Sequence, residues 1–499
     1  MRDLATSAQA RRVDELAASR GLSTLVLMEN AGRGASDVIL ARHGDLLARP
    51  LIVGGVGQNG GDAWVVARHL LARGVRPRVA LLGGRERVKG DAAVNLAVLS
   101  AHGVPVADVS SRDGLAALLD GASIVIDGIF GTGLARAIEG FLAQAIQQID
   151  GAETPIVALD LPSGISADTG AVMGVALHAR TTITFGLDKR GLQQHPGVDH
   201  AGHVVVESLG ALHAEPTGCV RLDASDLASL VLPRAADAHK GTAGHVLVVA
   251  GAPGHTGAAL LAALGAQRMG AGLVTIAARG AARAALDAKV VEAMTVEIPE
   301  ALEAGVAAVQ RECARKNAAV VGPGLGLDAT SQAYALRLAL ELTLPAVLDA
   351  DALTALATDP SALRASRGPR VLTPHPGEAA RLLGISTAAV QVDRYAAAHA
   401  LAERTGHVAV LKGARTIVAE PGGRMAVIAA GTPALGSGGT GDVLAGATGA
   451  MLAGGSEPFD AACAAALAHA RAGELAARFD RGLLAHEVAD ALPRALADR

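Results

Sequence analysis

The stretch LIVGGVGQNGGDAWVVARHLL, residues 51–71, decides how the first half of this chain folds. Three aliphatic residues lead into a glycine-rich turn, and the residues after the turn place apolar side chains such as Trp64 and Leu71 on one face of a helix. A strand, a glycine turn and a helix form one unit of a parallel sheet. Similar apolar runs that end in turns follow at 78–82, 123–133, 155–164 and 181–186. The first half is therefore predicted to be a mostly parallel α/β sheet covered by helices on both faces.

The same alternation restarts at HVLVVAG, residues 245–251, after a polar stretch with proline and glycine at 211–226. Further apolar runs occur at 273–277, 318–326, 345–353, 371–378 and 408–413. The polar stretch is typical of a domain boundary. We place the boundary between residues 214 and 215, which predicts an α/β domain over 1–214 and a second over 215–499.

The composition indicates which binding partners and which cellular compartment to expect. The 499 residues carry 44 basic and 48 acidic side chains, so the net charge of -4 offers no basic surface for a nucleic acid. Three widely spaced cysteines form neither a disulfide framework nor a zinc motif. Residues 1–21 lack the apolar core of a secretion signal, and the uncharged stretch 241–267 is interrupted by Gly, Pro and His. We expect a cytoplasmic protein that binds neither nucleic acid nor membrane.

Polar side chains follow several of the predicted strands in the first half. Asn59, Asp127 and Ser163 each stand at a strand end and offer oxygen, the ligand type that hard cations require. GTGLARA, residues 131–137, is a second glycine turn able to hold a phosphate, and Asp160 could accept hydrogen bonds from hydroxyl groups. Two structural alternatives stay open: a glycine turn that only joins a strand to a helix, and a strand-end Asp that only caps a helix.

Five motifs in this half resemble, in order and spacing, the epimerase domain of the NAD(P)H-hydrate repair enzymes, over residues 1–212. They are MENAG (28–32), GQNGGD (57–62), DGIFGTG (127–133), LDLPSG (159–164) and TFGLDKRG (184–191). The resemblance implies a Rossmann-like three-layer domain that interconverts the R and S hydrates of NADH and NADPH. It also implies a potassium ion on Asn59, Asp127 and Ser163. It places the substrate against Gln58, Asn59, Gly60, Gly61, Asp62, Gly131, Thr132, Gly133, Leu134, Ala135, Arg136, Ala137 and Asp160.

One departure from the family pattern concerns the first glycine turn, which usually reads NNGGDG. This chain has Gln58 and Ala63 at the first and last positions and keeps Asn59, so we expect an adjusted pocket. Epimerisation at the hydrated ring carbon needs proton transfer by a positioned group. Asp188 and Lys189 are candidates for that role, and the alternative is a solvated charge pair in a loop.

GSGGTGDVLAG, residues 436–446, is the strongest single motif in the chain. Consecutive glycines expose backbone N–H groups at a helix start, where an anion is favoured. Asp442 falls in the first helical turn, where a carboxylate could take the proton of a substrate hydroxyl as its oxygen attacks a phosphoryl group. The alternative is an Asp that caps the helix. KGART, residues 412–416, offers a cation, amides and a hydroxyl to a nucleotide phosphate, and His375 lies between two prolines.

These motifs, with HKGTAGHVLVVAG, GAGLVT and GPGLG in family order over 215–499, resemble the ADP-dependent NAD(P)H-hydrate dehydratase domain, which has a ribokinase-like α/β fold. The resemblance implies that the hydrated cofactor contacts Ala258, Gly324, His375 and Asp442. It assigns the adenine nucleotide to Lys412, Gly413, Ala414, Arg415, Thr416 and Gly441. It also implies Mg²⁺ with ADP, and AMP and phosphate as products. KGTAG replaces the usual KGDYG at Thr242 and Ala243, so we expect that loop to order differently.

The leading hypothesis joins both halves: NADHX and NADPHX are epimerised by the first and the S form is dehydrated by the second. A second hypothesis makes the C-terminal half a ribokinase-like kinase of hydroxymethyl groups. A third makes the N-terminal half a binding module without catalysis. We also expect a homo-oligomer.

Overall fold

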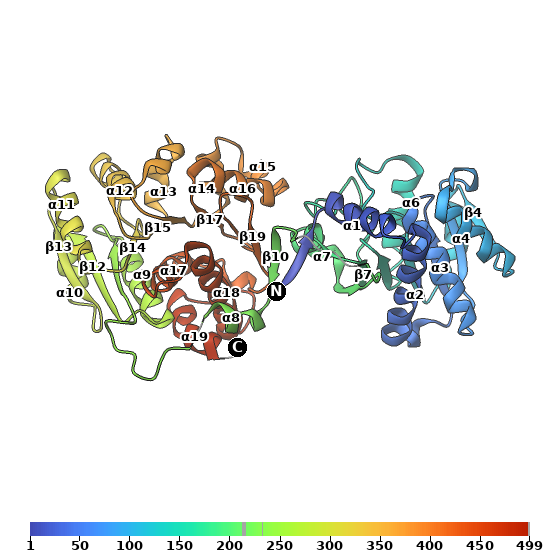
Figure 1. Cartoon of the computed structure of the whole chain (residues 1–499), viewed down its shortest axis with the longest axis horizontal. Coiled ribbons are helices and arrows are strands. Elements are labelled where there is room, and N and C mark those ends of the chain that lie inside the picture. Colours follow the sequence, from blue (N-terminus) through green and yellow to red (C-terminus); the bar gives the residue numbers. More distant parts are fainter. Residues whose placement is uncertain (212–215, 232, 498–499) are drawn as a thin grey trace. The chain divides into compact units, whose positions relative to one another are not determined.

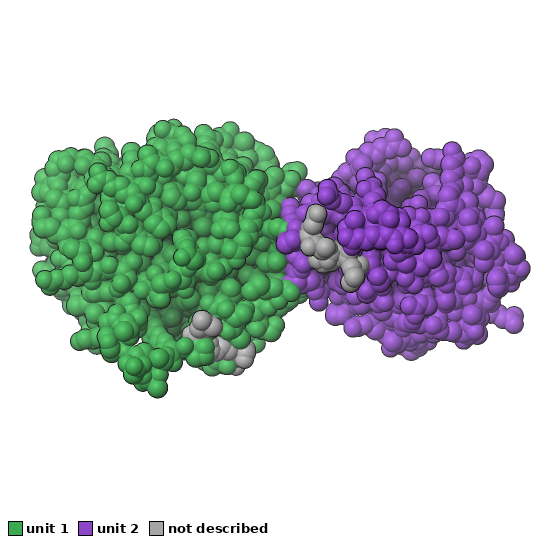
Figure 2. Space-filling model, viewed as in Figure 1, with its two compact units in different colours: residues 1, 218–499 green, residues 2–217 purple. Residues whose placement is uncertain are grey.

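The computed structural model describes residues 1–211, 216–231 and 233–497, which form two compact units (Figure 2). The N-terminal unit comprises Arg2–Thr217, and the C-terminal unit comprises Gly218–Arg499 together with Met1. The predicted boundary between 214 and 215 lies outside the described residues. Among the described residues, no helix combines the length and apolar character needed to cross a membrane.

The N-terminal unit is built on a parallel sheet with the strand order β4-β3-β2-β5-β6-β7-β9. The strands are β2 (Pro50–Gly54), β3 (Arg78–Leu82), β4 (Val106–Val109), β5 (Ile124–Gly128), β6 (Ile156–Leu159), β7 (Thr181–Phe185) and β9 (His203–Glu207). The chain adds strands to one side of β2 and then, from β5, to the other. This reversal between β2 and β5 is the switch point at which such sheets bind ligands, beyond the carboxyl ends of the strands.

Helices cover both faces of this sheet, as the sequence predicts (Figure 1). Along β2, Ile52 joins the core formed with α2, α3 and α4, whereas Leu51 and Val53 join the core formed with α5 and α6. Successive strand residues point to opposite faces, so a continuous apolar run needs both layers. The helices are α1 (Ser7–Ser19), α2 (Thr24–His43), α3 (Gln58–Ala72), α4 (Gly90–Ala101), α5 (Arg112–Leu119), α6 (Gly140–Asp150) and α7 (Gly197–Ala201).

A short strand pair lies beside the main sheet of the N-terminal unit. β1 (Arg2–Ala5) runs parallel to β8 (Asp188–Lys189), with Leu4 opposite Asp188 and Ala5 opposite Lys189. Asp188 and Lys189 are only 1% and 2% exposed. The alternative of a solvated charge pair in a loop is therefore wrong, because the strand pair buries both side chains.

The C-terminal unit contains a sheet in the order β13-β12-β11-β14-β15-β16-β17-β18-β19-β10. Its strands are β10 (Cys219–Leu222), β11 (His245–Val249), β12 (Leu273–Arg279), β13 (Met294–Ile298), β14 (Ala318–Val321), β15 (Ala346–Leu348), β16 (Arg370–Leu372), β17 (Val408–Leu411), β18 (Ile417–Ala419) and β19 (Met425–Ile428). The sheet is parallel from β13 to β17, and β18 is antiparallel to both of its neighbours.

Glycines allow two helices of this unit to pack closely. At the crossing of α9 and α17, a Cβ at Gly446 would lie 1.9 Å from the carbonyl oxygen of Ala262, and one at Gly265 would lie 2.3 Å from that of Val443. Larger residues would push the two helices apart. The helices are α8 (Leu227–Leu230), α9 (Thr256–Met269), α10 (Gly280–Asp287), α11 (Leu302–Cys313), α12 (Ala329–Glu341), α13 (Asp351–Leu356), α14 (Pro376–Leu383), α15 (Thr387–Val392), α16 (Arg394–Thr405), α17 (Thr440–Ala453), α18 (Pro458–Ala476) and α19 (Ala485–Ala497).

Two candidate active sites

The N-terminal unit contains a cavity of about 660 Å³ at its sheet switch point. Residues that follow β2, β5, β6 and β7 line it, together with the start of α3 and one face of α1. Among the described residues, its charged lining consists of Arg11, Asp14, Glu15, Asp62, Asp160 and Lys189. The cavity has the size of a small-molecule site and concentrates carboxylates at its wall.

The first glycine turn contains two kinds of residue: some line the cavity, and others only pack against the rest of the protein. Gln58, Asn59 and Asp62 line the cavity. Gly60 and Gly61 do not: a Cβ at Gly60 would lie 2.0 Å from the Gly55 carbonyl oxygen, and one at Gly61 would lie 2.5 Å from the Met28 side chain. Glycine is required at both positions for close packing of the α3 N-terminus.

The second glycine turn reaches the cavity only in its first part. Gly131, Thr132, Gly133 and Leu134 line it, whereas Ala135, Arg136 and Ala137 lie outside the lining. A Cβ at Gly131 would lie 2.8 Å from the Asp160 carboxylate, so this turn and Asp160 are in close contact.

A buried ion pair lies at the cavity wall. Asp160 adopts a left-handed backbone conformation with φ +64°, and its Oδ1 is 2.8 Å from Lys189 Nζ. Lys189 Nζ also donates to Thr184 Oγ1 at 2.9 Å and to the Phe185 carbonyl at 2.7 Å, while Asp160 Oδ2 accepts from Thr132 N at 3.0 Å. Burial alone would raise the pKa of Asp160, but Lys189 outweighs burial and lowers it. The lowered pKa favours the ionised form of Asp160 beside the Lys189 ammonium group.

Asp188 faces away from this cavity. Consecutive residues of a strand point to opposite sides, and only Lys189 of the pair lines the cavity. Asp188 Oδ2 instead accepts from Gln193 Nε2 at 3.0 Å and lies 3.6 Å from an Arg2 guanidinium nitrogen. The structure thus separates the two residues that the sequence pairs as proton-transfer candidates.

Asp127 and Ser163 form a fully buried cluster at the ends of β5 and β6. Asp127 Oδ1 accepts from Ser163 Oγ at 2.6 Å, and Oδ2 accepts from Ser163 N at 2.8 Å. Burial raises the pKa of Asp127 to about 6 despite these hydrogen bonds. Asn59 donates through Nδ2 to the Leu159 carbonyl at 3.0 Å, and its buried Oδ1 has no hydrogen-bond partner within the described part of the chain.

In the C-terminal unit, Asp442 lies in the first turn of α17. The N-cap of that helix is Gly439, at φ +90°, and no side chain caps it. The alternative in which Asp442 serves as the capping residue is therefore wrong. Burial, strengthened by Asp349 and opposed by Lys412, raises the pKa of Asp442 to about 7. A carboxylate with this pKa can accept a proton near neutral pH.

A second ion pair, partly buried, lies near Asp442. Lys412 Nζ is 2.8 Å from Asp349 Oδ1, which also accepts from Thr373 Oγ1 at 2.8 Å. Burial would lower the pKa of Lys412, but Asp349 and Glu378 outweigh it and raise the pKa. A Cβ at Gly441 would lie 3.3 Å from Lys412 Nζ, so the ammonium group is beside the glycine motif at the helix start.

The remaining predicted residues of this site lie in loops, except Ala258, which lies in the first turn of α9. A Cβ at Gly324 would lie 3.1 Å from Ala258 Cβ, so these two predicted cofactor contacts are neighbours. In the KGART turn, Gly413 and Arg415 adopt left-handed conformations at φ +136° and +57°, and Thr416 Oγ1 donates to the Gly413 carbonyl at 2.9 Å.

His375 has a structural role that the sequence analysis left open. It caps α14, and its Nδ1 accepts from Gly377 N at 3.0 Å. Its side chain is still 55% exposed, so the ring remains accessible to a ligand. Glu378 Oε2 completes the capping box by accepting from His375 N at 2.8 Å.

The sequence analysis missed Asp349 and Asp14. Asp349 follows β15, and the strand-end rule applied to Asp127 would have found it in LDADAL. Asp14 lies on α1, before the first recognised motif, and nothing in its local sequence distinguishes it from a surface carboxylate.

The fold and the sites define a class: a two-unit α/β enzyme with glycine turns and buried acid groups at the carboxyl ends of parallel strands. Residues 246–494 match the family model described as NAD(P)H-hydrate dehydratase, and residues 24–191 match the model described as YjeF-related protein N-terminus. The two matched regions together span most of the chain, and each lies within one of the two units.

Curated relatives match the whole chain. The bifunctional NAD(P)H-hydrate repair enzyme Nnr of Moorella thermoacetica is 40% identical and covers 99% of this chain and 96% of its own. The proteins of the same name from Salinibacter ruber and Escherichia coli are 37% and 36% identical, covering 96% and 95% of this chain and 93% and 90% of their own. A solved ADP/ATP-dependent NAD(P)H-hydrate dehydratase of Bacillus subtilis, co-crystallised with ATP/Mg²⁺, is 32% identical over 55% of this chain and 96% of its own, with a TM-score of 0.47. This chain belongs to the family of bifunctional NAD(P)H-hydrate repair enzymes.

Proposed function

We propose that the N-terminal unit epimerises the R and S hydrates of NADH and NADPH and that the C-terminal unit dehydrates the S form. The observation that carries this proposal is the presence of both sites in one chain that matches bifunctional relatives over nearly its full length. Joining the two activities is chemically sensible because they share a substrate, and epimerisation supplies the form that dehydration consumes.

In the N-terminal cavity, we assign the substrate phosphates to the cavity-lining part of the two glycine turns, through Gln58 and Asn59 of the first and Gly131 to Leu134 of the second. In this assignment Asp160 accepts a hydrogen bond from a ribose hydroxyl, since Lys189 holds its carboxylate at the cavity wall. Lys189 acts as a positioning residue, because its ammonium group contacts the Asp160 carboxylate, Thr184 Oγ1 and the Phe185 carbonyl.

A potassium ion fits the donor set of Asn59, Asp127 and Ser163. All three supply oxygen, and the buried Oδ1 of Asn59 has no hydrogen-bond partner among the described residues. Among those residues, no three His, Cys, Asp or Glu side chains cluster as a transition-metal site requires. When bound, potassium would supply positive charge that holds the substrate's anionic groups near the glycine turns.

Potassium should therefore stabilise the N-terminal unit in wild-type protein. We expect its melting temperature to rise when KCl replaces N-methylglucamine chloride at constant ionic strength, because a ligand that binds only the folded state stabilises it. Asp127→Asn should weaken potassium binding at least about tenfold, as even outer-shell changes do. Equal melting temperatures in both salts would contradict the site, and calorimetry with the two salts would measure it directly.

In the C-terminal unit, we assign Lys412 to Thr416 and Gly441 to the nucleotide, and Ala258, Gly324 and His375 to the hydrated cofactor. Hydroxide is a poor leaving group, so phosphoryl transfer from ADP to the ring hydroxyl, with Asp442 taking its proton, makes elimination possible. ADP then ends as AMP and phosphate. Mg²⁺ is expected to bind the nucleotide phosphates, and Asp349 and Glu378 are buried carboxyl groups near Lys412 that could contribute oxygen ligands.

The proposal is tested with purified protein, a mixed R and S hydrate sample, ADP and Mg²⁺. Complete recovery of the dihydronicotinamide absorbance is expected, with one AMP and one phosphate for each cofactor. Recovery of only the S hydrate as dihydronicotinamide would contradict the epimerase assignment. A stable phosphorylated product would favour the kinase hypothesis. ATP in a parallel sample shows which nucleotide is used.

We further propose that the protein works in the cytoplasm as a homo-oligomer. Light scattering on the purified protein measures the oligomeric state, and fractionation of the producing cells measures the compartment.

A further inference from the structure

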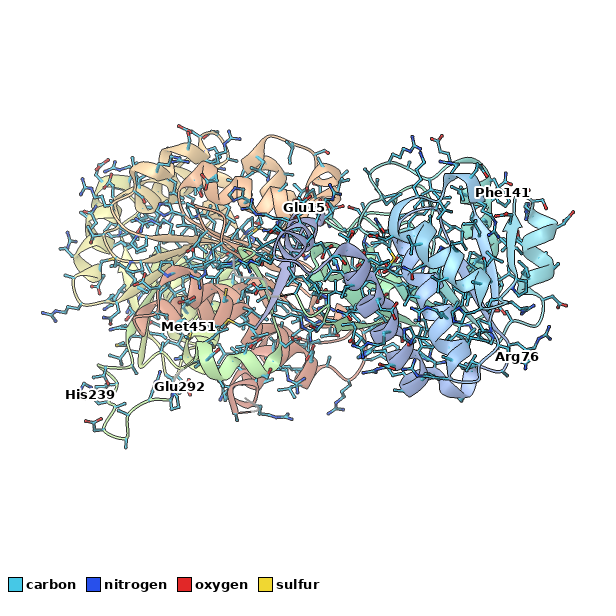
Figure 3. All side chains as sticks on the ribbon, turned by 45° about the vertical axis from the view of Figure 1, so that its right-hand side comes forward. Glu15, Arg76, Phe141, His239, Glu292 and Met451 are labelled. Atoms are coloured by element: carbon cyan, nitrogen blue, oxygen red, sulfur yellow. The ribbon has the colours of Figure 1, made fainter. Side chains whose placement is uncertain are left out.

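Helix α1 forms a wall of the N-terminal cavity. Ala10, Arg11, Asp14, Glu15 and Ala18 line the cavity and repeat at the spacing of one helix face. None of the recognised motifs includes this helix, and the matching family model begins only at residue 24. In Figure 3, Glu15 marks the helix.

Several contacts within the N-terminal unit fix α1 in this position. β1, which precedes it, pairs with the strand that carries Lys189, so the start of the helix is tied to the cavity wall. Ser7 Oγ donates to Asp168 Oδ2 at 3.1 Å, and Gln9 Nε2 donates to the Thr217 carbonyl at 2.8 Å. Thr6 and Gln9 form a capping box at the helix start. The position of Asp14 in the cavity is therefore set by the fold.

The cavity holds more carboxylates than its buried cation can neutralise. Lys189 is paired with Asp160, which leaves Asp14 of α1 and Asp62 of α3 beside that pair. Burial raises the pKa of Asp62 well above its usual value, and Asp160 and Asp14 raise it further. Burial also raises the pKa of Asp14, with Lys189 opposing and Asp160 adding to the rise. A raised pKa lets a carboxyl group keep its proton to a higher pH than an ordinary Asp, as a general acid requires.

We propose that Asp14 and Asp62 are the proton-transfer pair of the epimerase. This inference rests on the epimerase function proposed above and assigns its acid and base. Asp14 lies on α1 and Asp62 on α3, and both side chains line the same cavity. Asp160 and Lys189 form the fixed, charged part of the wall.

For a hydroxyl on the carbon next to the ring nitrogen, epimerisation proceeds by loss and return of water. The protonated carboxyl donates its proton to the hydroxyl, and the C–O bond breaks with its electron pair on the departing water. The ring nitrogen's lone pair forms the C=N bond of an iminium. Water then forms a new C–O bond on the opposite face, the C=N electrons return to nitrogen, and the ionised carboxylate takes the released proton.

Asp14→Asn tests the pair in the full-length protein. With R hydrate as substrate, we expect the epimerisation rate constant above the spontaneous rate to fall about 100-fold or more, with KM changed less than about threefold. Asp14→Glu, which keeps an acid group, should recover part of the rate. The matched control is Asp113→Asn on α5, an exposed position outside the cavity lining. Dehydration of S hydrate by the same samples checks that the protein is intact.

The pH profile separates proton transfer from a structural role. Wild-type epimerisation should show a bell-shaped dependence on pH, and Asp14→Asn should lose one limb. A variant that retains a rate within threefold of wild type, or both limbs of the profile, overturns the proposal. If wild-type protein itself leaves R hydrate unrepaired while it dehydrates S hydrate, the epimerase function fails instead.

Discussion

Asp442→Asn is expected to lower the dehydration rate constant by about 10²- to 10⁴-fold, because the variant removes the carboxylate that takes the proton from the attacking hydroxyl. The amide has nearly the same shape, so binding of the nucleotide should change little. Dehydration of S hydrate with ADP, followed by absorbance, measures the effect. Asp480→Asn, an exposed Asp of the same unit, is the matched control and should behave as wild type.

Two further measurements test whether the substitution acts on the chemical step of dehydration. The R-to-S interconversion of the same variant should be unchanged, since that reaction occurs in the N-terminal unit. The pKa of Asp442 is raised to about 7, so its ionised fraction falls as pH falls below neutrality. Wild-type dehydration should then decrease toward acid pH, and Asp442→Asn should show no such decrease. A variant with wild-type rate would rule out Asp442 as the base.

Lys189→Met is expected to destabilise the N-terminal unit by about 3–5 kcal/mol, because breaking a buried ion pair leaves its partner charge uncompensated. Asp160 would lose its cation, and Thr184 Oγ1 and the Phe185 carbonyl would lose a donor. The unfolding transition of this unit in urea, in the full-length protein, measures the loss. Lys89→Met is the matched control, since Lys89 is exposed.

The double variant Asp160→Asn with Lys189→Met distinguishes the ion pair from simple loss of packing. Removing both charges should return part of the stability lost in the single variant, because no buried charge is then left alone. If the double variant is as unstable as Lys189→Met, the pair contributes little and the methionine fits poorly. The pKa of Asp160 is lower in the folded protein than in the unfolded chain. Its ionised form therefore stabilises the fold at pH values above the unfolded-state pKa, and this stability is lost as pH falls through the folded-state pKa.

The strands that the sequence predicts best are those buried on both faces. Ile124–Gly128, Ala318–Val321 and Val408–Leu411 are continuous apolar runs because helices cover them on both sides. β13, at the edge of its sheet, is partly exposed and mixes polar with apolar residues, so its pattern gives no such signal. The two-residue strand β8 is too short for any period to identify.

The residues of the candidate sites also differ in whether the local sequence predicts them. Asp127, Ser163 and Asp442 were found because each follows a strand or a glycine motif, and local chain geometry alone brings such positions to the carboxyl edge of a parallel sheet. Asp14 reaches the N-terminal cavity only because a strand pairing and a capped helix place it there. No local pattern contains that information.

By itself, the sequence determined the two α/β units, the glycine turns and the family, since these follow from local periodicity and from contiguous motifs. Only the tertiary structure decided which carboxylates share a cavity, that Lys189 faces it while Asp188 faces away, and that Asp349 pairs with Lys412. The physical reason is that burial and charge pairing depend on contacts between residues far apart in the chain, and these contacts set both the pKa values and the roles of the side chains.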